Sequence, residues 1–242
     1  MSSPHERRRT HHIATVAVLA DPVRRSLYEF ALSREPGDVS RDQAAEALGI
    51  RRGLAAFHLD KLVEAGLMRT EYRRPSGVGG PGAGRPTKFY RRSHEPIEVS
   101  LPQRRYDLMG RFLADAVTDG RAPGARRAQV AAQGYGRELG AIARGRGGAR
   151  PSAGRLIAEA LAVLAEHGFE PVRQGRHRII LRNCPFHALA VDYNDTVCEV
   201  NLAMHRGVVE SLGAGSLRAE REPSPGRCCV AYRTVKVGSR GE

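Results

Sequence analysis

SRDQAAEALGIRRGLAAFHLDKLVEAG, residues 40–66, has the pattern of two short helices joined by a tight turn. Ser40 can cap the first helix with its side chain, and Gly49 can end it because glycine adopts the left-handed C-cap conformation at little cost. The second helix carries an apolar stripe at helical spacing and ends at Gly66. The residues of this stripe are Ala55, Leu59 and Leu62. The stretch therefore predicts a helix-turn-helix.

The segments on either side extend this pattern to a winged domain. Residues 21–33, DPVRRSLYEFALS, open with an aspartate that can cap a helix and a proline at the first helical position. Residues 67–74 and 87–93 have the composition of strands, and the stretch between them is too rich in Gly and Pro for regular structure. Helix, turn, helix and hairpin in this order predict a winged helix-turn-helix.

The outward face of the second helix and the hairpin predict contacts with double-stranded DNA. Arginine at the start of a recognition helix can read guanine with two hydrogen bonds, whereas Gly53, Leu54 and Ala56 offer no side-chain hydrogen bonds, so direct readout is expected to be sparse. The predicted contacts are Arg51, Arg52, Phe57 and Lys61 on the helix and Arg73, Arg74, Arg85 and Lys88 on the wing. The alternatives are phosphate clamps or surface charge on the helix, and a solvated basic loop at the wing.

The centre of the chain is predicted to be helical. Residues 101–117 carry apolar side chains along one side, and residues 125–143 form a second expected helix, followed by a linker at 145–151. The apolar side chains of the first segment are Tyr106, Met109, Phe112, Leu113 and Ala116. An exposed apolar helix after a small winged domain favours pairing of two chains, so we expect a homodimer.

The last ninety residues have mixed patterns. A helix is expected from Ser152 to Gly168, then paired strands at 170–174 and 177–184. A long helix from about Pro185 or His187 to Leu212 and strands at 217–222 and 228–235 complete the expected elements. The predicted fold class is α+β. Its predicted parts are a DNA-binding domain at 12–95, a helical dimerisation and linker region at 100–148, and a cysteine-containing sensor domain at 151–237.

Composition limits the class of protein. The sequence has 242 residues with 39 Lys and Arg against 26 Asp and Glu, a formal net charge of +13, which attracts polyanions such as nucleic acid. No apolar run is long enough for a membrane span, and the N-terminal residues lack the apolar region of a signal peptide. These features predict a cytoplasmic protein with no membrane partner. Four cysteines in a reducing compartment indicate metal, cluster or redox ligands rather than a disulfide framework.

The cysteines come from three separate elements. Cys184 is expected at the end of a strand, Cys198 within the long helix, and Cys228 or Cys229 at the start of the last strand. Neighbouring residues of a strand point to opposite sides, so one of the last two can join a shared site, and Cys228 is preferred with Cys229 as the alternate. Cluster, zinc and metal-free redox chemistry remain open, as does burial of the cysteines as small hydrophobic residues.

His187 and His205 are the possible fourth ligands. On one continuous helix they share a face with Cys198, but a rise of about 1.5 Å per residue places His187 roughly 16 Å and His205 roughly 10 Å from it. His187 could instead join the site beside Cys184, and His205 could do so only across a multi-atom cluster. A surface or core role is the alternative for each histidine.

Two resemblances follow from these motifs. DPVRRSLYEFALS, SRDQAAEALGI, FHLDKLVEAGLM and GRPTKFYRR resemble the ArsR-type winged-helix repressors over about residues 12–93. NCPF at 183–186, the cysteine fourteen residues after Cys184 and the terminal cysteine strand are similar to the sensor half of SufR-like regulators. The second resemblance implies a 4Fe-4S or 2Fe-2S iron–sulfur cluster, with zinc as the alternative, and together they imply a redox- or metal-sensing transcription regulator.

Two other classes of function are weighed. A structural nucleoid-binding protein would share the basic charge but would bind DNA without operator preference. A Cys-dependent enzyme could pair Cys184 with His187, yet the sequence shows no orienting third group and no oxyanion-hole pattern. We therefore expect a protein that is not an enzyme.

Overall fold

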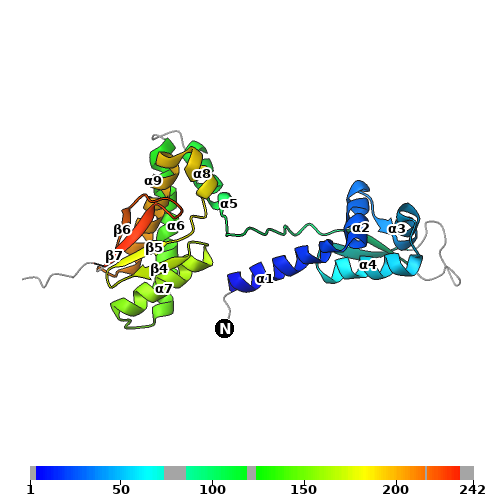
Figure 1. The fold of residues 1–242 in the computed structure, drawn as a ribbon, viewed down its shortest axis with the longest axis horizontal. Coiled ribbons are helices and arrows are strands. Elements are labelled where there is room, and N and C mark those ends of the chain that lie inside the picture. The colour runs from blue at the N-terminus through cyan, green and yellow to red at the C-terminus, as the bar shows by residue number, and fades with distance from the viewer. Residues whose placement is uncertain (1–3, 74–85, 119–123, 216, 235–242) are drawn as a thin grey trace, which may run out of the picture. The chain divides into compact units, whose positions relative to one another are not determined.

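The structure is a computed structural model that describes residues 4–73, 86–118, 124–215 and 217–234 (Figure 1). The chain divides into two compact units, Met1–Val99 (unit 1) and Ser100–Glu242 (unit 2). Both units combine helices with an antiparallel sheet. The predicted α+β class is confirmed.

Unit 1 contains the predicted helices and hairpin strands, with helix ends set by local hydrogen bonds. Asp21 Oδ1 accepts the backbone N–H of Arg24 at 3.0 Å, and Ser40 forms a capping box with Gln43. Gly49 ends a helix with φ of 62°. The elements are α1 (Pro4–Ala17), η1 (Val18–Ala20), α2 (Pro22–Ser33), β1 (Val39–Ser40), α3 (Arg41–Leu48), α4 (Arg52–Glu64), β2 (Met68–Arg73) and β3 (Thr87–Arg92).

Two elements of unit 1 differ from the sequence expectation. The helix α1 lies mostly before residue 12, the predicted domain start, and it lacks the apolar periodicity that reveals a helix. Tertiary contacts hold it: buried Thr15 donates its hydroxyl to the carbonyl of Ala65 at 3.1 Å. The two-residue strand β1 pairs with β3, where Val39 lies opposite Tyr90, and the sheet order is β1-β3-β2. A strand of two residues has no recognisable period.

Unit 2 packs helices around a four-stranded antiparallel sheet of order β4-β5-β7-β6. The expected cap at Ser152 is present, because its hydroxyl accepts the backbone N–H of Arg155 at 3.2 Å. The elements are α5 (Tyr106–Thr118), α6 (Gly124–Gly147), α7 (Ala153–Glu166), β4 (Pro171–Gln174), β5 (Arg178–Leu181), α8 (His187–Asp192), α9 (Asn194–Leu212), β6 (Leu217–Arg221) and β7 (Val230–Thr234).

The long helix α6 belongs to unit 2 and packs backbone against backbone on α9. A Cβ at Gly136 would lie 1.9 Å from the carbonyl oxygen of Met204, and one at Gly207 would lie 2.1 Å from that of Gln133. The predicted division between residues 100–148 and 151–237 therefore does not separate two compact bodies. The helix also continues to Gly147, through the first part of the predicted linker.

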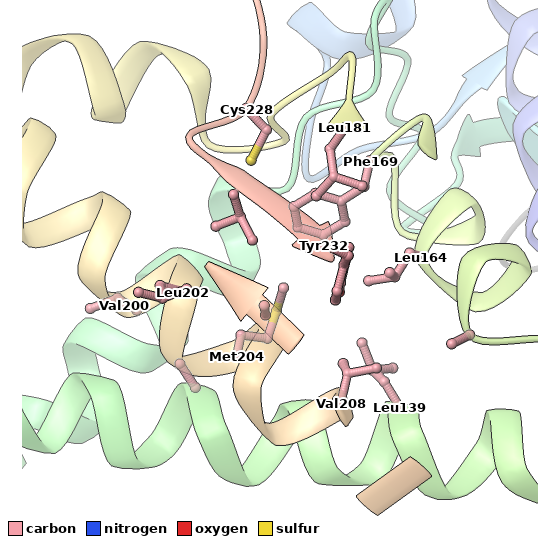
Figure 2. Close-up of a cluster of buried hydrophobic side chains, with 14 of the residues drawn as sticks. Leu139, Leu164, Phe169, Leu181, Val200, Leu202, Met204, Val208, Cys228 and Tyr232 are labelled. Atoms are coloured by element: carbon pink, nitrogen blue, oxygen red, sulfur yellow. The ribbon is translucent and has the colours of Figure 1, made fainter. Parts of the chain in front are cut away.

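One core cluster joins the helices of unit 2 to its sheet, and Figure 2 shows part of it, with Cys228 among the apolar side chains. All four cysteines belong to this cluster. The predicted long helix is wrong in one respect: the chain leaves helical geometry at Tyr193, with ψ of 50°, so α8 and α9 are separate helices. The polar residues Asp192, Asn194 and Asp195 at this break do not reveal it, because they could equally lie on the exposed face of a continuous helix.

Candidate functional site

The recognition helix α4 orients its side chains as the apolar stripe predicts. Ala55, Leu59 and Leu62 are fully buried, whereas Leu54 is 42% exposed and Phe57 is 54% exposed. His58 is also buried, at the edge of the apolar stripe, and its Nδ1 has no hydrogen-bond partner in the described structure. The outward face offers apolar and aromatic surface, which suits contact with thymine methyl groups and with DNA shape.

Most of the predicted DNA-binding cations on α4 have an acidic partner within the unit. Arg52 Nε lies 2.6 Å from Asp42, and Lys61 Nζ lies 2.7 Å from Glu64. In the described part of the chain, Arg51 has no ion-pair partner and is exposed at the N-cap of the helix. Exposed ion pairs contribute little to stability, so DNA phosphates can replace the carboxylates.

The wing cations are held in a network with acidic residues. Arg73 pairs with Asp38 and Glu71, and Arg91 lies 2.8 Å from Glu71. The Arg73 guanidinium lowers the pKa of the Glu71 carboxyl, so this carboxylate stays charged. Arg74 and Arg85, two further predicted contacts, lie outside the described residues.

The wing is connected to α4 through Asp60. Lys88 Nζ donates to Asp60 Oδ1 at 2.5 Å, and the Tyr90 hydroxyl donates to the same oxygen at 2.9 Å. Burial raises the pKa of the Tyr90 hydroxyl, which therefore remains a donor. Strand β3 and the recognition helix are thus fixed to one another at one carboxylate.

The cysteines meet at a pocket in unit 2. The pocket has a volume of about 400 Å³, more than ten times the roughly 30 Å³ that a water molecule occupies. Its walls come from the segment after β5, from α8, from the start of α9 and from the segment before β7. The ligand-type side chains on these walls are Cys184, His187, Cys198 and Cys229. Cys228 does not line the pocket and is fully buried.

Hydrogen bonds position the Cys184 segment. The carbonyl of Cys184 accepts the backbone N–H of His187 at 3.1 Å and a guanidinium N–H of Arg104 at 2.9 Å. Buried Asn183 donates its side-chain amide to the carbonyl of Gly168 at 2.6 Å. Cys184 therefore lies in a fixed turn three residues after the end of β5, and not within the strand as predicted.

The thiols form a continuous chain of contacts. Cys184 lies beside Cys228, Cys228 beside Cys229, and Cys229 beside Cys198. Hydrogen bonds from the thiols of Cys198 and Cys228 lower the pKa of Cys229 to about 3, and the contact with Cys229 raises the pKa of Cys198. One negative charge is therefore stabilised within the group, on a sulfur that faces the pocket.

Polar side chains lie behind the thiols on α9. Asn201 Nδ2 donates to the Cys228 sulfur at 3.2 Å, and buried His205 shares a hydrogen bond of 2.5 Å with the Tyr232 hydroxyl. Burial lowers the pKa of His205 to about 3, so its ring is neutral. His205 Nε2 and Asn201 Oδ1 have no partner in the described structure. No pattern in the sequence indicates Asn201, because its contact with Cys228 joins α9 to the segment before β7.

The structure changes which predicted residues can act together. The preferred Cys228 lies beneath the pocket, and its alternate Cys229 lies on the wall. His187 is on α8, so the distance predicted along one continuous helix does not apply, and it shares the pocket with Cys184 and Cys198. His205 is enclosed in the core. Among the described residues, no three His, Cys, Asp or Glu side chains are grouped so that they could hold a single metal ion.

Comparison with known families concerns the first unit. Residues 19–71 match a family model described as a helix-turn-helix domain. The matched stretch of this helix-turn-helix domain includes α2, α3 and α4 and supports the resemblance to ArsR-type regulators there. No curated protein and no solved structure matches the chain. No helix in the described residues has both the length and the apolar character needed to cross a membrane.

Proposed function

We propose that this protein is a dimeric DNA-binding transcription regulator whose affinity for its operator is controlled by an iron–sulfur cluster in unit 2. The observation that carries the proposal is the convergence of Cys184, Cys198 and Cys229 on one pocket in a chain whose other unit is a helix-turn-helix domain. A structural nucleoid-binding protein has no need of such a pocket.

The donor set fits a cluster. Iron–sulfur clusters are held by thiolates, and the pocket offers three, with His187 at the fourth position. The thiols form a chain of neighbours and do not converge on a point, which suits an inorganic core of several atoms better than a single zinc ion. A bound cluster would supply sensitivity to oxidants and to iron supply.

The chain's own residues would prepare the site. The pocket-lining cysteines Cys184, Cys198 and Cys229 would supply the thiolates, and thiol donors lower the pKa of Cys229, which favours its thiolate form. Asn201 donates to buried Cys228, which lies beside two of the proposed ligands, Cys184 and Cys229.

Control of DNA binding requires linkage between the units. A change at the pocket alters operator affinity only by the difference between its free energies in the two conformations of the dimer. Ligation would hold α9 to the segments that flank the sheet, because Cys198 is on α9 while Cys184 and Cys229 flank β5 and β7. Pairing of two chains through unit 2 would carry the change to both recognition helices.

One experiment tests the sensor part of this proposal. The full chain is purified without oxygen, and iron, sulfide, zinc and visible absorption are measured for the wild type and for Cys184→Ser. We expect iron and sulfide in equal amounts in the wild type and their loss in the variant. Stoichiometric zinc without sulfide would replace the cluster by a zinc site, and metal-free protein would favour a thiol redox switch.

A second experiment tests the DNA-binding part. Footprinting of genomic fragments with the anaerobic full chain should show a defined operator, and removal of iron by a chelator should change the affinity for it. Equal protection of all fragments would indicate a nucleoid-binding protein.

A further inference from the structure

Cys228 has a different environment from the other three described cysteines. It is 0% exposed, it does not line the pocket, and the Asn201 side-chain amide donates to its sulfur at 3.2 Å. Its sulfur therefore cannot be reached from solvent, and its reaction partners are limited to groups already beside it. The neighbouring sulfurs are those of Cys184 and Cys229.

Cys184 and Cys228 lie on adjacent chain segments. Strands β5 and β7 are antiparallel neighbours, with Ile180 opposite Ala231, and the backbone N–H of Cys228 donates to the carbonyl of Leu181 at 3.0 Å beyond the end of the ladder. A disulfide between the two cysteines needs a Cα separation of roughly 4.4–6.8 Å. The two thiols are neighbours.

We propose that Cys184 and Cys228 form a disulfide when the pocket holds no metal centre and a hydroperoxide enters it. Cys184 lines the pocket and is the thiol that meets the oxidant, and Cys228 is the buried partner that resolves the product. The proposal rests on the proposed function only in treating Cys184 as a ligand, because the disulfide would then prevent reloading of the site until it is reduced.

The reaction balances with the peroxide as oxidant. The Cys184 sulfur attacks one peroxide oxygen, the O–O bond breaks, and the departing hydroxide takes a proton to give water. The Cys228 sulfur then attacks the resulting sulfenic acid, the S–S bond forms, the S–O bond breaks, and a second water leaves. Two thiols are oxidised by two electrons in total, and one hydrogen peroxide is reduced to two waters.

The alternative pair is Cys198 and Cys229, whose thiols are also neighbours. This pair joins α9 to the segment before β7, and both sulfurs lie on the pocket wall. Each can therefore meet a further peroxide molecule before the partner sulfur reacts. Of these two pairs of cysteines that are not adjacent in the chain, Cys184 and Cys228 combine a sulfur on the pocket wall with one that the core protects, and this protection favours the disulfide over higher oxidation.

The test uses double variants of the full chain, because tryptic cleavage at Arg182, Arg206, Arg227 and Arg233 leaves two cysteines on each peptide. Cys198→Ser with Cys229→Ser keeps the proposed pair, and Cys184→Ser with Cys228→Ser keeps the alternative pair. Each is made metal-free with a chelator, treated with one equivalent of hydrogen peroxide, alkylated and weighed by mass spectrometry. Circular dichroism verifies that both are folded.

We expect the first variant to lose two hydrogens and take up no alkyl label until dithiothreitol is added, and the second to keep two labelled thiols. The proposal is overturned if a disulfide forms only in the second variant, or if Cys184 is oxidised to a sulfinic acid in the first. Oxidised wild type provides a check without substitutions: cleavage before Asp195 separates Cys184 from Cys198, and the label should remain on Cys198 and Cys229. Because all samples lack metal, the result does not depend on whether a cluster binds.

Discussion

At the scale of single residues, Asp60 connects the two DNA-binding elements of unit 1. Its carboxylate accepts hydrogen bonds from Lys88 Nζ and from the hydroxyl of Tyr90, which is 1% exposed. The wing lysine is therefore neutralised while no DNA is present. A DNA phosphate that binds Lys88 must compete with the Asp60 carboxylate. Asp60 itself lies on the recognition helix α4.

We predict that Asp60→Asn raises the affinity for DNA in general by several fold. The substitution removes a negative charge beside the DNA-binding face and frees Lys88, and each added phosphate contact steepens the salt dependence by about one unit. Stability should fall by about 1 kcal/mol because Tyr90 loses a charged acceptor. Binding titrations at several salt concentrations measure the effect. Asp115→Asn removes the same charge at an exposed position of unit 2 and should leave the affinity for DNA unchanged.

His205 predicts how the stability of unit 2 depends on pH. Burial lowers its pKa from 6.5 to about 3, so between these values the unfolded chain binds a proton that the folded chain does not. Stability is therefore fully present above pH 6.5 and falls as the pH decreases, by up to about 1.4 kcal/mol per pH unit. Urea unfolding of metal-free protein at pH 7 and pH 5 measures this loss. An equal loss in His205→Gln would show that other groups cause it.

At the scale of elements, the contact between α6 and α9 holds unit 2 together. Gly136 and Gly140 on α6 and Gly207 on α9 lie where the two backbones meet. Close approach of the backbones brings the start of α9, with Cys198, into a fixed position relative to the sheet. The geometry of the thiol pocket thus depends on α6, although none of the candidate ligands lies on this helix.

We predict that Gly136→Ala destabilises unit 2 by about 1–3 kcal/mol or more. The new methyl group would overlap the Met204 carbonyl, and packed cores relieve such overlap only by moving backbone. Gly134→Ala is the matched control on the same helix, because a Cβ there meets no atom within 4 Å. It should stabilise the protein by about 0.5–1 kcal/mol through helix propensity. Thermal unfolding compares the two variants, and similar changes in both would argue against the close contact.

The start of α4 gives a prediction for DNA recognition. Arg51 is exposed at the N-cap, where a recognition helix approaches base edges, whereas Arg52 is paired with Asp42. We expect Arg51→Ala to weaken operator binding by about 1–3 kcal/mol and to relax the preference for one base pair. Competition binding with operator variants measures both effects. Arg155→Ala removes the same charge from unit 2, and an equal loss there would mean that net charge alone is responsible.

At the scale of the whole molecule, separate compact units hold the two candidate sites. The helix-turn-helix lies within Met1–Val99, and all four cysteines lie within Ser100–Glu242. A ligand that binds only the folded form of one unit stabilises that unit, and it affects the other only through coupling between them.

Calorimetry of the anaerobic full chain should therefore show two transitions. If the proposed cluster is tightly bound, its loss by chelation or by Cys184→Ser removes about 2.7 kcal/mol or more and lowers the transition of unit 2 by about 5–10 °C. The transition of unit 1 should move by less than about 2 °C. A single transition that moves as a whole would show that the two units unfold together.

The sequence determined the local elements and the chemical types. Caps at Asp21, Ser40 and Ser152, the left-handed Gly49 and the apolar stripe of α4 are each set by residues within one or two turns, so they could be predicted. Short-range hydrogen bonds and side-chain period depend on neighbours along the chain. The thiols of the candidate site could be named for the same reason, because their chemistry belongs to the residue type.

Only the tertiary structure decided which of those residues meet. The position of Cys229 on the pocket wall, the burial of Cys228 and the Asn201 contact all involve segments far apart in sequence. Likewise, Thr15 of α1 donates a hydrogen bond to the carbonyl of Ala65, and Lys88 of β3 donates to Asp60 of α4. Such contacts depend on the packing of α6 on α9 and on strand register, which arise from the summed burial of many side chains and leave no local pattern.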